Sequence, residues 1–480
     1  MYSVTALLEG YRTKQFSPVE IAKGYIEKAK QHSDLNAFIS ITEDFALQQA
    51  KISELKWQLG ETGPLEGVPL SYKDNLHTKG VASTSGSKID QNFVPEKNAG
   101  VIEAMHGAGA VMIGKNNMHE FAFGITNNNP FYGPAKNPWN TELTPGGSSG
   151  GSAVAVLAGL SAASLGTDTG GSVRIPAASC GLVGLKPTHG LISGQGVTPI
   201  SWSLDHPGPI TKDVSDLIYM MEGLTGDEYS VIDPEAEDLR GVKIGVPVNF
   251  FTEKIEDDVL AGYKKALRQL EQLGAHLVDV KVPYADEAMR LTFTVAIAEG
   301  GYTHKDRMVH MEDYGPDVAH VMEASKSILA SDYIHALNRK AEIQAACDSL
   351  LEQVDAIVTP TIPAQPKPIG KEFVSFAGEE EPIFDCMIRY ASYFNLTGHP
   401  AISLPVGLAN GKKERSSASR KSMKIIIWEN FMKNAASKWQ PTHKFNWKER
   451  AHRPFFFLMD GERVLKALAG TRKIMQSRLK

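Results

Sequence analysis

Apolar and polar positions alternate along the first sixty residues with two different periods. Residues 18–31 repeat apolar side chains on one helical face, and Ser17 and Pro18 supply an N-cap and a first-turn proline, which are typical of a helix start. The strand-like run 36–41 follows, and residues 44–60 are amphipathic with the helical period. The pattern therefore predicts helix, strand and helix in this order.

The same alternation continues toward the middle of the chain. The short apolar run 68–72 lies between glycine and proline residues and predicts a strand that ends at Lys73. Residues 99–109 predict a helix, which leads to a short strand, 110–114. A further helix, 148–163, begins inside a glycine-rich turn. Strands that alternate with helices favour an α/β sheet.

Strand 239–247, helix 257–274 and strand 276–283 extend the alternation. No internal repeat or low-complexity linker divides the chain, so we expect a single α/β domain over residues 1–411. Residues 412–480 differ in composition, and we expect a divergent basic segment there whose structure the pattern does not predict.

The overall composition is that of an ordinary soluble protein. Of the 480 residues 42% are hydrophobic and 22% charged, with a formal net charge of -5, which gives no electrostatic reason to expect a nucleic-acid or membrane partner. The longest apolar stretch, from Ala153, is shorter than the ~20 residues that cross a bilayer. The chain start lacks the pattern of a signal peptide. We therefore expect a cytoplasmic protein.

The cysteines and histidines suggest no disulfide framework and no metal site. The cysteines lie far apart without a CxxC pair, and they are Cys180, Cys347 and Cys386. Cys180 lies in an apolar context typical of a core residue. The histidines show no H-E-x-x-H spacing, among them His77, His119 and His189.

The last seventy residues form a basic segment. Positions 411–480 hold 18 Lys or Arg against 5 Asp or Glu, which gives this segment a formal net charge of about +13. The remainder of the chain therefore has a formal net charge of about -18. They also contain Trp428, Trp439 and Trp447. Basic residues interleaved with aromatic ones can bind nucleic acid, but a solvated tail or an abnormal terminus is the favoured interpretation.

A glycine-rich stretch, "TPGGSSGGSAV" at 144–154, allows three interpretations. No lysine follows the glycines, so it is not a phosphate-binding loop. It runs directly into an apolar helical segment, so it is not a flexible linker. A tight turn and a platform for a reactive serine both remain.

A second glycine cluster favours the reactive serine. Thr169, Gly170 and Gly171 precede Ser172, and small residues there would let backbone N–H groups converge on a developing oxyanion. Ser172 would then be a nucleophile that needs a base. The G-x-S-x-G elbow is absent, but a lysine can serve if burial lowers its pKa toward 7.

Four motifs of the segment from Lys73 to Pro209 resemble the amidase signature enzymes: "GVPLSYKDN", "TPGGSSGGSA", "GTDTGGSVRIPA" and "CGLVGLKPT". The resemblance implies a large mixed β-sheet covered by helices on both faces and no cofactor. It also implies a Ser-Ser-Lys triad, in which Ser172 is the nucleophile, Ser148 the bridging serine and Lys73 the general base.

Further roles follow from the same resemblance. The amides of Thr169, Gly170 and Gly171 would form the oxyanion hole, with a cis peptide between Gly171 and Ser172. The two turns, 24 residues apart at Ser148 and Ser172, can meet at one end of the sheet.

Three neighbouring polar residues are expected to support the site. We expect the hydroxyl of Ser149 to satisfy backbone groups at its helix start. Asp168 and Arg174 either pair structurally or orient the site directly.

The resemblance covers two kinds of amidase. In the glutamine-hydrolysing component of glutamyl-tRNA(Gln) amidotransferase, its A subunit, an acidic residue holds the glutamine amino group at the position of Ile388, and Arg389 follows, as in many general amidases. No arginine lies between Met308 and Leu337 to hold the glutamine carboxylate. A hydrolase of small carboxamides is therefore favoured, with segments 120–135 and 300–390 building its pocket.

The alternatives differ in their partners. The amidotransferase component would need partner subunits and tRNA, whereas a free amidase needs only its amide substrate, with a homodimer left open. A weaker alternative is a non-catalytic scaffold or nucleic-acid binder that uses the basic segment.

The family pattern also ends near Gly411, where a final sheet strand would normally follow, and this departure makes that strand doubtful.

Overall fold

The computed structural model describes residues 2–229, 239–408 and 422–427. Within these ranges the α-helices are α1 (Val4–Arg12), α2 (Pro18–Gln31), α3 (Glu43–Leu59), α4 (Gly100–Gly107), α5 (Gly150–Ala158), α6 (Arg174–Cys180), α7 (Val214–Thr225), α8 (Asp257–Gln272), α9 (Ala288–His304), α10 (Pro316–Ser325), α11 (Ala330–Leu351), α12 (Ile383–Ile388) and α13 (Ser392–Leu396). Short 3-10 helices are η1 (Ser33–Leu35), η2 (Glu120–Ala122) and η3 (Met308–Asp313). None of the described helices is long and apolar enough to cross a membrane.

The strands over the same residues are β1 (Phe38–Ile41), β2 (Pro69–Lys73), β3 (Val111–Asn116), β4 (Ala163–Asp168), β5 (Val183–Lys186), β6 (His206–Thr211), β7 (Lys243–Pro247), β8 (His276–Val280), β9 (Ala356–Ile357), β10 (Thr359–Pro360), β11 (Phe373–Phe376), β12 (Glu379–Pro382), β13 (Ala401–Leu408) and β14 (Ser422–Ile427). They form a nine-stranded sheet in the order β1-β3-β2-β4-β6-β5-β13-β14-β10, a three-stranded sheet, β8-β7-β9, and the hairpin β11-β12.

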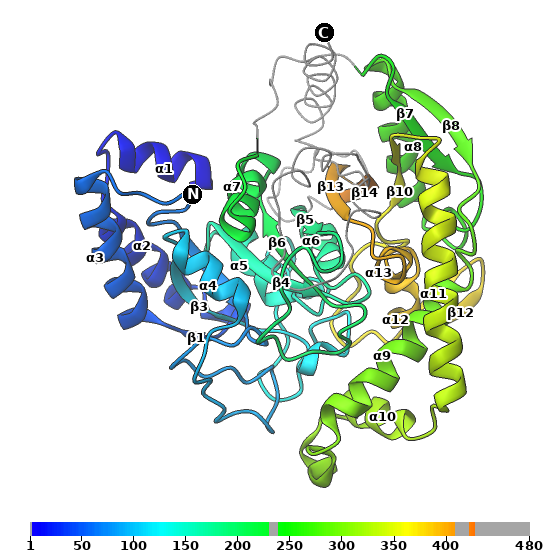
Figure 1. Ribbon diagram of the computed structural model, residues 1–480, viewed down its shortest axis with the longest axis horizontal. Coiled ribbons are helices and arrows are strands. Elements are labelled where there is room, and N and C mark those ends of the chain that lie inside the picture. The colour runs from blue at the N-terminus through cyan, green and yellow to red at the C-terminus, as the bar shows by residue number, and fades with distance from the viewer. Residues whose placement is uncertain (1, 230–238, 409–421, 428–480) are drawn as a thin grey trace, which may run out of the picture.

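The large sheet is mixed, and it confirms the predicted fold class. Its strands β3, β2 and β4 are parallel to one another, whereas the pairs from β4 through β6, β5 and β13 to β14 are antiparallel. Every residue of β2, β3, β4, β5 and β6 is buried, which requires that both faces of the sheet are covered. Figure 1 shows α5, α6 and α7 gathered around these central strands.

Most of the predicted elements are present, and several of their ends are corrected. The strand predicted over 239–247, for example, begins at Lys243, and the strand predicted over 276–283 ends at Val280. Ser17 caps α2 in a full capping box with Glu20. The helix predicted to reach residue 163 ends at Ala158, because Gly159 takes the left-handed conformation of a helix cap. Strand β3 continues past Gly114 to Asn116, since this glycine allows β1 to approach: a Cβ there would lie 2.4 Å from the carbonyl oxygen of Ser40.

The sheet extends past Gly411, where we predicted the domain to end. Strand β14 lies between β13 and β10 and supplies the sheet strand that the sequence made doubtful. The remainder of the basic segment 412–480, with its three tryptophans, lies outside the described residues. All three cysteines are buried, and none of them forms a disulfide within the described residues.

Candidate active site

Parallel pairing of β2 and β4 brings three sequence-predicted segments together. The carboxyl ends of neighbouring parallel strands lie at the same edge of a sheet, so Lys73 at the end of β2 lies beside the turn that follows β4. The glycine-rich turn before α5 joins them, because the backbone N–H of Ser149 donates to the carbonyl oxygen of Ser172 over 3.2 Å. The two glycine clusters therefore meet at one place, as the sequence predicted.

Lys73 is fully buried and its ammonium group has specific acceptors. Its Nζ donates to Ser148 Oγ over 2.7 Å and to Thr167 Oγ1 over 2.8 Å. Burial lowers the pKa of Lys73 to about 7, although the carboxylates of Asp205 and Asp168 oppose this shift. Near neutral pH a large fraction of Lys73 is therefore an uncharged amine that can accept a proton.

The two predicted serines differ in access. Ser148 is fully buried against Lys73, whereas Ser172 keeps 5% of its surface exposed. The hydroxyl nearer to Lys73 is thus the enclosed one, and Ser172 lies toward the open side. This order is the one that a relay from an outer to an inner hydroxyl would need.

One backbone prediction is wrong. In the described residues the cis peptide joins Gly147 to Ser148, not Gly171 to Ser172. The turn before Ser172 is instead made by Gly171 with a φ of 130°, a conformation that side chains rarely adopt. A Cβ at Gly171 would also lie 2.6 Å from Ile175 Cδ1, so glycine is required by space as well.

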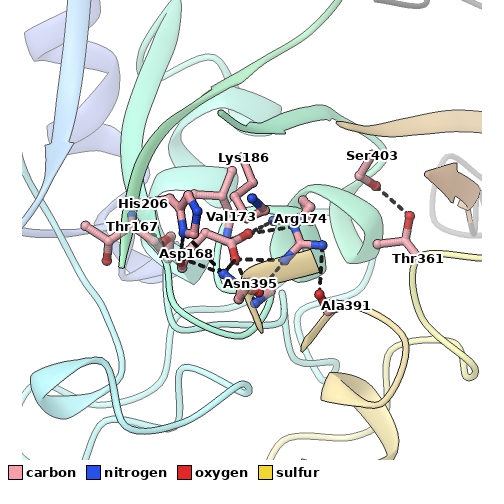
Figure 2. Close-up of polar contacts among 12 residues, drawn as sticks. Thr167, Asp168, Val173, Arg174, Lys186, His206, Thr361, Ala391, Asn395 and Ser403 are labelled. Carbon is pink, nitrogen blue, oxygen red and sulfur yellow. Dashed lines mark hydrogen bonds and ion pairs between the residues drawn. The ribbon is translucent and has the colours of Figure 1, made fainter. Parts of the chain in front are cut away.

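The buried ion pair between Asp168 and Arg174 holds the turn before Ser172 in place. The carboxylate of Asp168 accepts from Arg174 Nε and Nη2, both over 2.9 Å, and from Asn395 Nδ2 over 2.8 Å (Figure 2). Burial opposes the ionisation of Asp168, but Arg174 and Asn395 outweigh it and lower its pKa to about 2. Arg174 also donates to Asn395 Oδ1 and to the carbonyl oxygen of Ala391, so Asp168 and Arg174 form a structural pair.

The carboxylate of Asp168 also binds one of the backbone amides that were predicted to form the oxyanion hole. The N–H of Gly171 donates to Asp168 Oδ1 over 2.8 Å. Within the described residues, the N–H groups of Thr169, Gly170 and Ser172 donate to no protein acceptor. Three amides of the loop 169–172 therefore stay available to an incoming oxygen, but the amide of Gly171 is already used.

The contacts that Ser149 and Thr167 make in the site were not predicted from the sequence. The hydroxyl of Ser149 donates to the carbonyl oxygen of Thr167 over 3.2 Å and accepts from the Thr167 N–H over 3.4 Å. It accepts from no backbone N–H at the start of α5, so it ties the turn to β4 and does not cap the helix. Thr167 binds Lys73 directly, yet nothing but its place inside "GTDTGGS" distinguished it in the sequence.

Comparison with known proteins identifies the family. The family model described as Amidase matches residues 20–413. The chain belongs to the amidase signature family. Over 493 residues it is 34% identical to the A subunit of the glutamyl-tRNA(Gln) amidotransferase from Thermoanaerobacter pseudethanolicus, and the match covers 94% of this chain and 99% of that protein.

Solved structures agree with this assignment. A crystal structure of an amidase is 28% identical, with a TM-score of 0.83 over 99% of this chain and 100% of that one. The structure of the corresponding amidotransferase component from Thermotoga maritima is 31% identical, with a TM-score of 0.68 over 85% and 87%. This amidase is accordingly an enzyme that hydrolyses amide C–N bonds.

An apolar side chain of this amidase lies beside the proposed oxyanion loop. A Cβ built on Gly170 would lie 2.6 Å from Cδ1 of Ile388, which is itself 5% exposed. On the other side, a Cβ built on Gly147 would lie 2.8 Å from the backbone nitrogen of Asn127. Segments 120–135 and 300–390 thus both contact the site's glycines.

The arginines that flank the middle segment of this amidase already have acidic partners. Arg307 lies 2.9 Å from Asp90, and Arg339 lies 2.7 Å from Glu287. Arg389, which follows Ile388, pairs with Glu381. None of these three guanidinium groups is left as an unpaired cation for a substrate carboxylate.

Proposed function

We propose that this amidase cleaves a carboxamide through an acyl-enzyme on Ser172. Ser172 Oγ attacks the carbonyl carbon while its proton moves to Ser148 Oγ, and the proton of Ser148 moves to Lys73 Nζ. The resulting ammonium returns a proton through Ser148 to the leaving nitrogen, and the C–N bond breaks. Water then attacks the ester by the same relay and releases the carboxylic acid and free Ser172.

The observation that carries this proposal is the contact between Lys73 and Ser148. A distance of 2.7 Å allows direct proton transfer, and a pKa of about 7 lets the same lysine accept and later donate a proton at neutral pH. The exposed fraction of Ser172 supports its role as the hydroxyl that meets substrate. No step of this sequence uses a cofactor or a metal, whose absence stays a prediction.

The oxyanion would be held by amides of the loop 169–172. We propose Thr169 and Gly170, as the sequence suggested, together with the amide of Ser172 in place of Gly171. Asp168 holds the Gly171 amide and so shapes the loop instead of donating to substrate. Fixed donors aimed at developing charge are worth about 3–4 kcal/mol each in such enzymes.

For the substrate we propose a small carboxamide without an amino acid head group. Ile388 offers an apolar wall beside Gly170 at the position where the amidotransferase component is expected to carry an acid. Arg307, Arg339 and Arg389 are engaged with carboxylates and so are poor candidates to hold a glutamine carboxylate.

The second candidate is glutamine hydrolysis as one component of a tRNA-dependent amidotransferase. Sequence similarity favours it, since the relative from Thermoanaerobacter is matched over nearly its whole length. This candidate requires partner subunits and a route for ammonia to them. Glutamine therefore belongs in every substrate test.

The first test uses a fluorophosphonate probe and intact-protein mass spectrometry, which need no guess at substrate. Wild type and Ser179→Ala should each gain one adduct, and Ser172→Ala none; Ser179 is a buried serine of α6 whose Oγ has no partner among the described residues. Failure of wild type to react, or an adduct retained by Ser172→Ala, would reject the nucleophile.

Substrate choice is tested next by ammonia release from glutamine and from a set of aliphatic and aromatic carboxamides. We expect kcat/KM for the best carboxamide to exceed that for glutamine at least about tenfold, because a charged head group would be buried against Ile388 without a partner. The reverse order would establish the second candidate.

A further inference from the structure

A loop outside the recognised motifs reaches the oxyanion loop with a carboxylate. Asp205 Oδ1 accepts a hydrogen bond from Thr169 Oγ1 over 2.6 Å. Its Oδ2 accepts from the backbone N–H groups of Ile200 and Ser201 over 3.0 and 3.1 Å. Both oxygens are therefore committed, and Asp205 holds the side chain of Thr169 in one orientation.

The loop that carries Asp205 is itself held by hydrogen bonds to a carboxylate of α9. Glu299 of α9 is 1% exposed and accepts from Ser201 Oγ over 2.6 Å and from the N–H of Ser203 over 3.1 Å. Tyr333 of α11 donates to the same carboxylate over 2.8 Å. The position of Asp205 is thus fixed by two helices that the triad does not touch.

The negative charge of Asp205 also raises the pKa of Lys73. Burial lowers the pKa of Lys73, and of the two carboxylates that oppose this shift Asp205 acts more strongly than Asp168. The charge of Asp168 is compensated by Arg174, and Lys186 also faces it. In the part of the chain that the structure describes, the hydrogen-bond donors to Asp205 are neutral, and Lys73 is a cation that favours its charged form.

We propose that Asp205 is a positioning residue of this amidase, which aligns the oxyanion loop through Thr169 and adjusts the basicity of Lys73 through its charge. Both effects come from the same carboxylate. The hydrogen bond to Thr169 sets the direction of the loop amides, whereas the charge favours the ammonium form of Lys73. This inference rests on the proposed function, in which Lys73 acts as base.

The test measures the rate of labelling by the fluorophosphonate probe between about pH 5 and pH 9. Asp205→Asn keeps the shape and removes the charge, so Lys73 should lose its proton at lower pH and the rise of the rate should move down by at least about half a pH unit. Because burial raises the pKa of Asp205 to about 6, the two proteins should differ mainly between that pH and about 7, the pKa of Lys73. Their rates should converge at higher pH, where Lys73 is neutral in both.

Thr169→Val and Thr169→Ser form a matched pair. Valine keeps the shape of threonine without the hydroxyl, and serine keeps the hydroxyl, so the serine variant should be labelled at least about fivefold faster than the valine variant. The midpoint of the pH profile should stay close to that of wild type in Thr169→Ser, which keeps the hydroxyl that binds Asp205.

Each outcome decides between two ideas. An unlabelled wild type would reject the proposed function itself. A labelled wild type with an unmoved midpoint in Asp205→Asn, or with equal rates in the Thr169 pair, would overturn the positioning role and leave the triad intact. Should Asp205→Asn fail to fold by circular dichroism, the Thr169 pair alone decides.

Discussion

At the scale of single residues, the proposed chemistry of this amidase depends on the burial of one lysine, Lys73. An exposed lysine is protonated at neutral pH and cannot act as a base. Burial removes Lys73 from water, and the hydroxyls of Ser148 and Thr167 replace the lost solvent without adding a negative charge. The side chain therefore becomes a moderate base within reach of a serine.

Lys73→Met is expected to reduce the rate of amide hydrolysis about a thousandfold, because no other base contacts Ser148 among the described residues. In wild type the rate should rise with pH through about 7, the pKa of Lys73, since the neutral amine is the reactive form. Steady-state rates across pH give both results.

Lys28 supplies the control. Burial also lowers its pKa, but its Nζ donates to the carbonyl oxygen of Ala158. Lys28→Met should keep the pH profile of wild type. An undiminished rate in Lys73→Met would remove Lys73 from the mechanism.

At the scale of elements, the short turn between β4 and α6 carries most of the functional geometry. It combines a positive φ at Gly171, a buried carboxylate at Asp168 and free amides at Thr169 and Gly170. A turn of this shape needs glycine at Gly171, and a Cβ on Gly170 would lie 2.6 Å from Ile388 Cδ1. Its sequence is therefore constrained by backbone conformation as much as by chemistry.

Gly171→Ala is expected to cost about 1–3 kcal/mol of stability and to abolish labelling of Ser172, since the added Cβ would lie 2.6 Å from Ile175 Cδ1 and 2.8 Å from Ala391 Cβ. Gly190→Ala is the control, because Gly190 has a φ of 77° but nothing within 4 Å of a built Cβ. It should cost about 1 kcal/mol and leave labelling intact. Urea unfolding and probe labelling measure the two effects, and equal losses in both variants would contradict the steric argument.

At the scale of the whole molecule, strands from distant parts of the chain share one sheet. Strand β13 pairs with β5 more than two hundred residues earlier, and β9 of the small sheet also contacts β14. The two sheets are further linked by α8, which packs on β8 and β13. We therefore expect them to unfold together.

Ile244→Ala tests this cooperativity. Ile244 is fully buried in β7, so the substitution should cost about 2–5 kcal/mol. Unfolding in urea, followed by circular dichroism and by loss of probe labelling, should give one coincident transition at a lower midpoint. Val248→Ala, at a position that is 62% exposed, should change the midpoint little. Two separate transitions would divide residues 1–411 into independent units.

The sequence by itself predicted most of the elements and supplied the candidate reactive residues. Hydrophobic periodicity predicted β2, β3, α2 and α8 to within a few residues, because local conformation depends on neighbours along the chain. The four motifs made Lys73, Ser148 and Ser172 candidates, because their glycine- and serine-rich sequences resemble those of the amidase signature enzymes. The parallel pairing of β2 with β4, a strand that the pattern did not predict, was visible only in the structure.

Only the tertiary structure decided how the groups around these residues are used. Asp168 occupies the Gly171 amide, Asp205 reaches Thr169 across 36 positions of sequence, and Ile388 lies against Gly170. Such contacts join segments that no local pattern relates, because they arise when the sheet brings distant turns to one edge. The lowered pKa of Lys73 has the same origin, since burial is a property of the folded molecule and not of the sequence around the lysine.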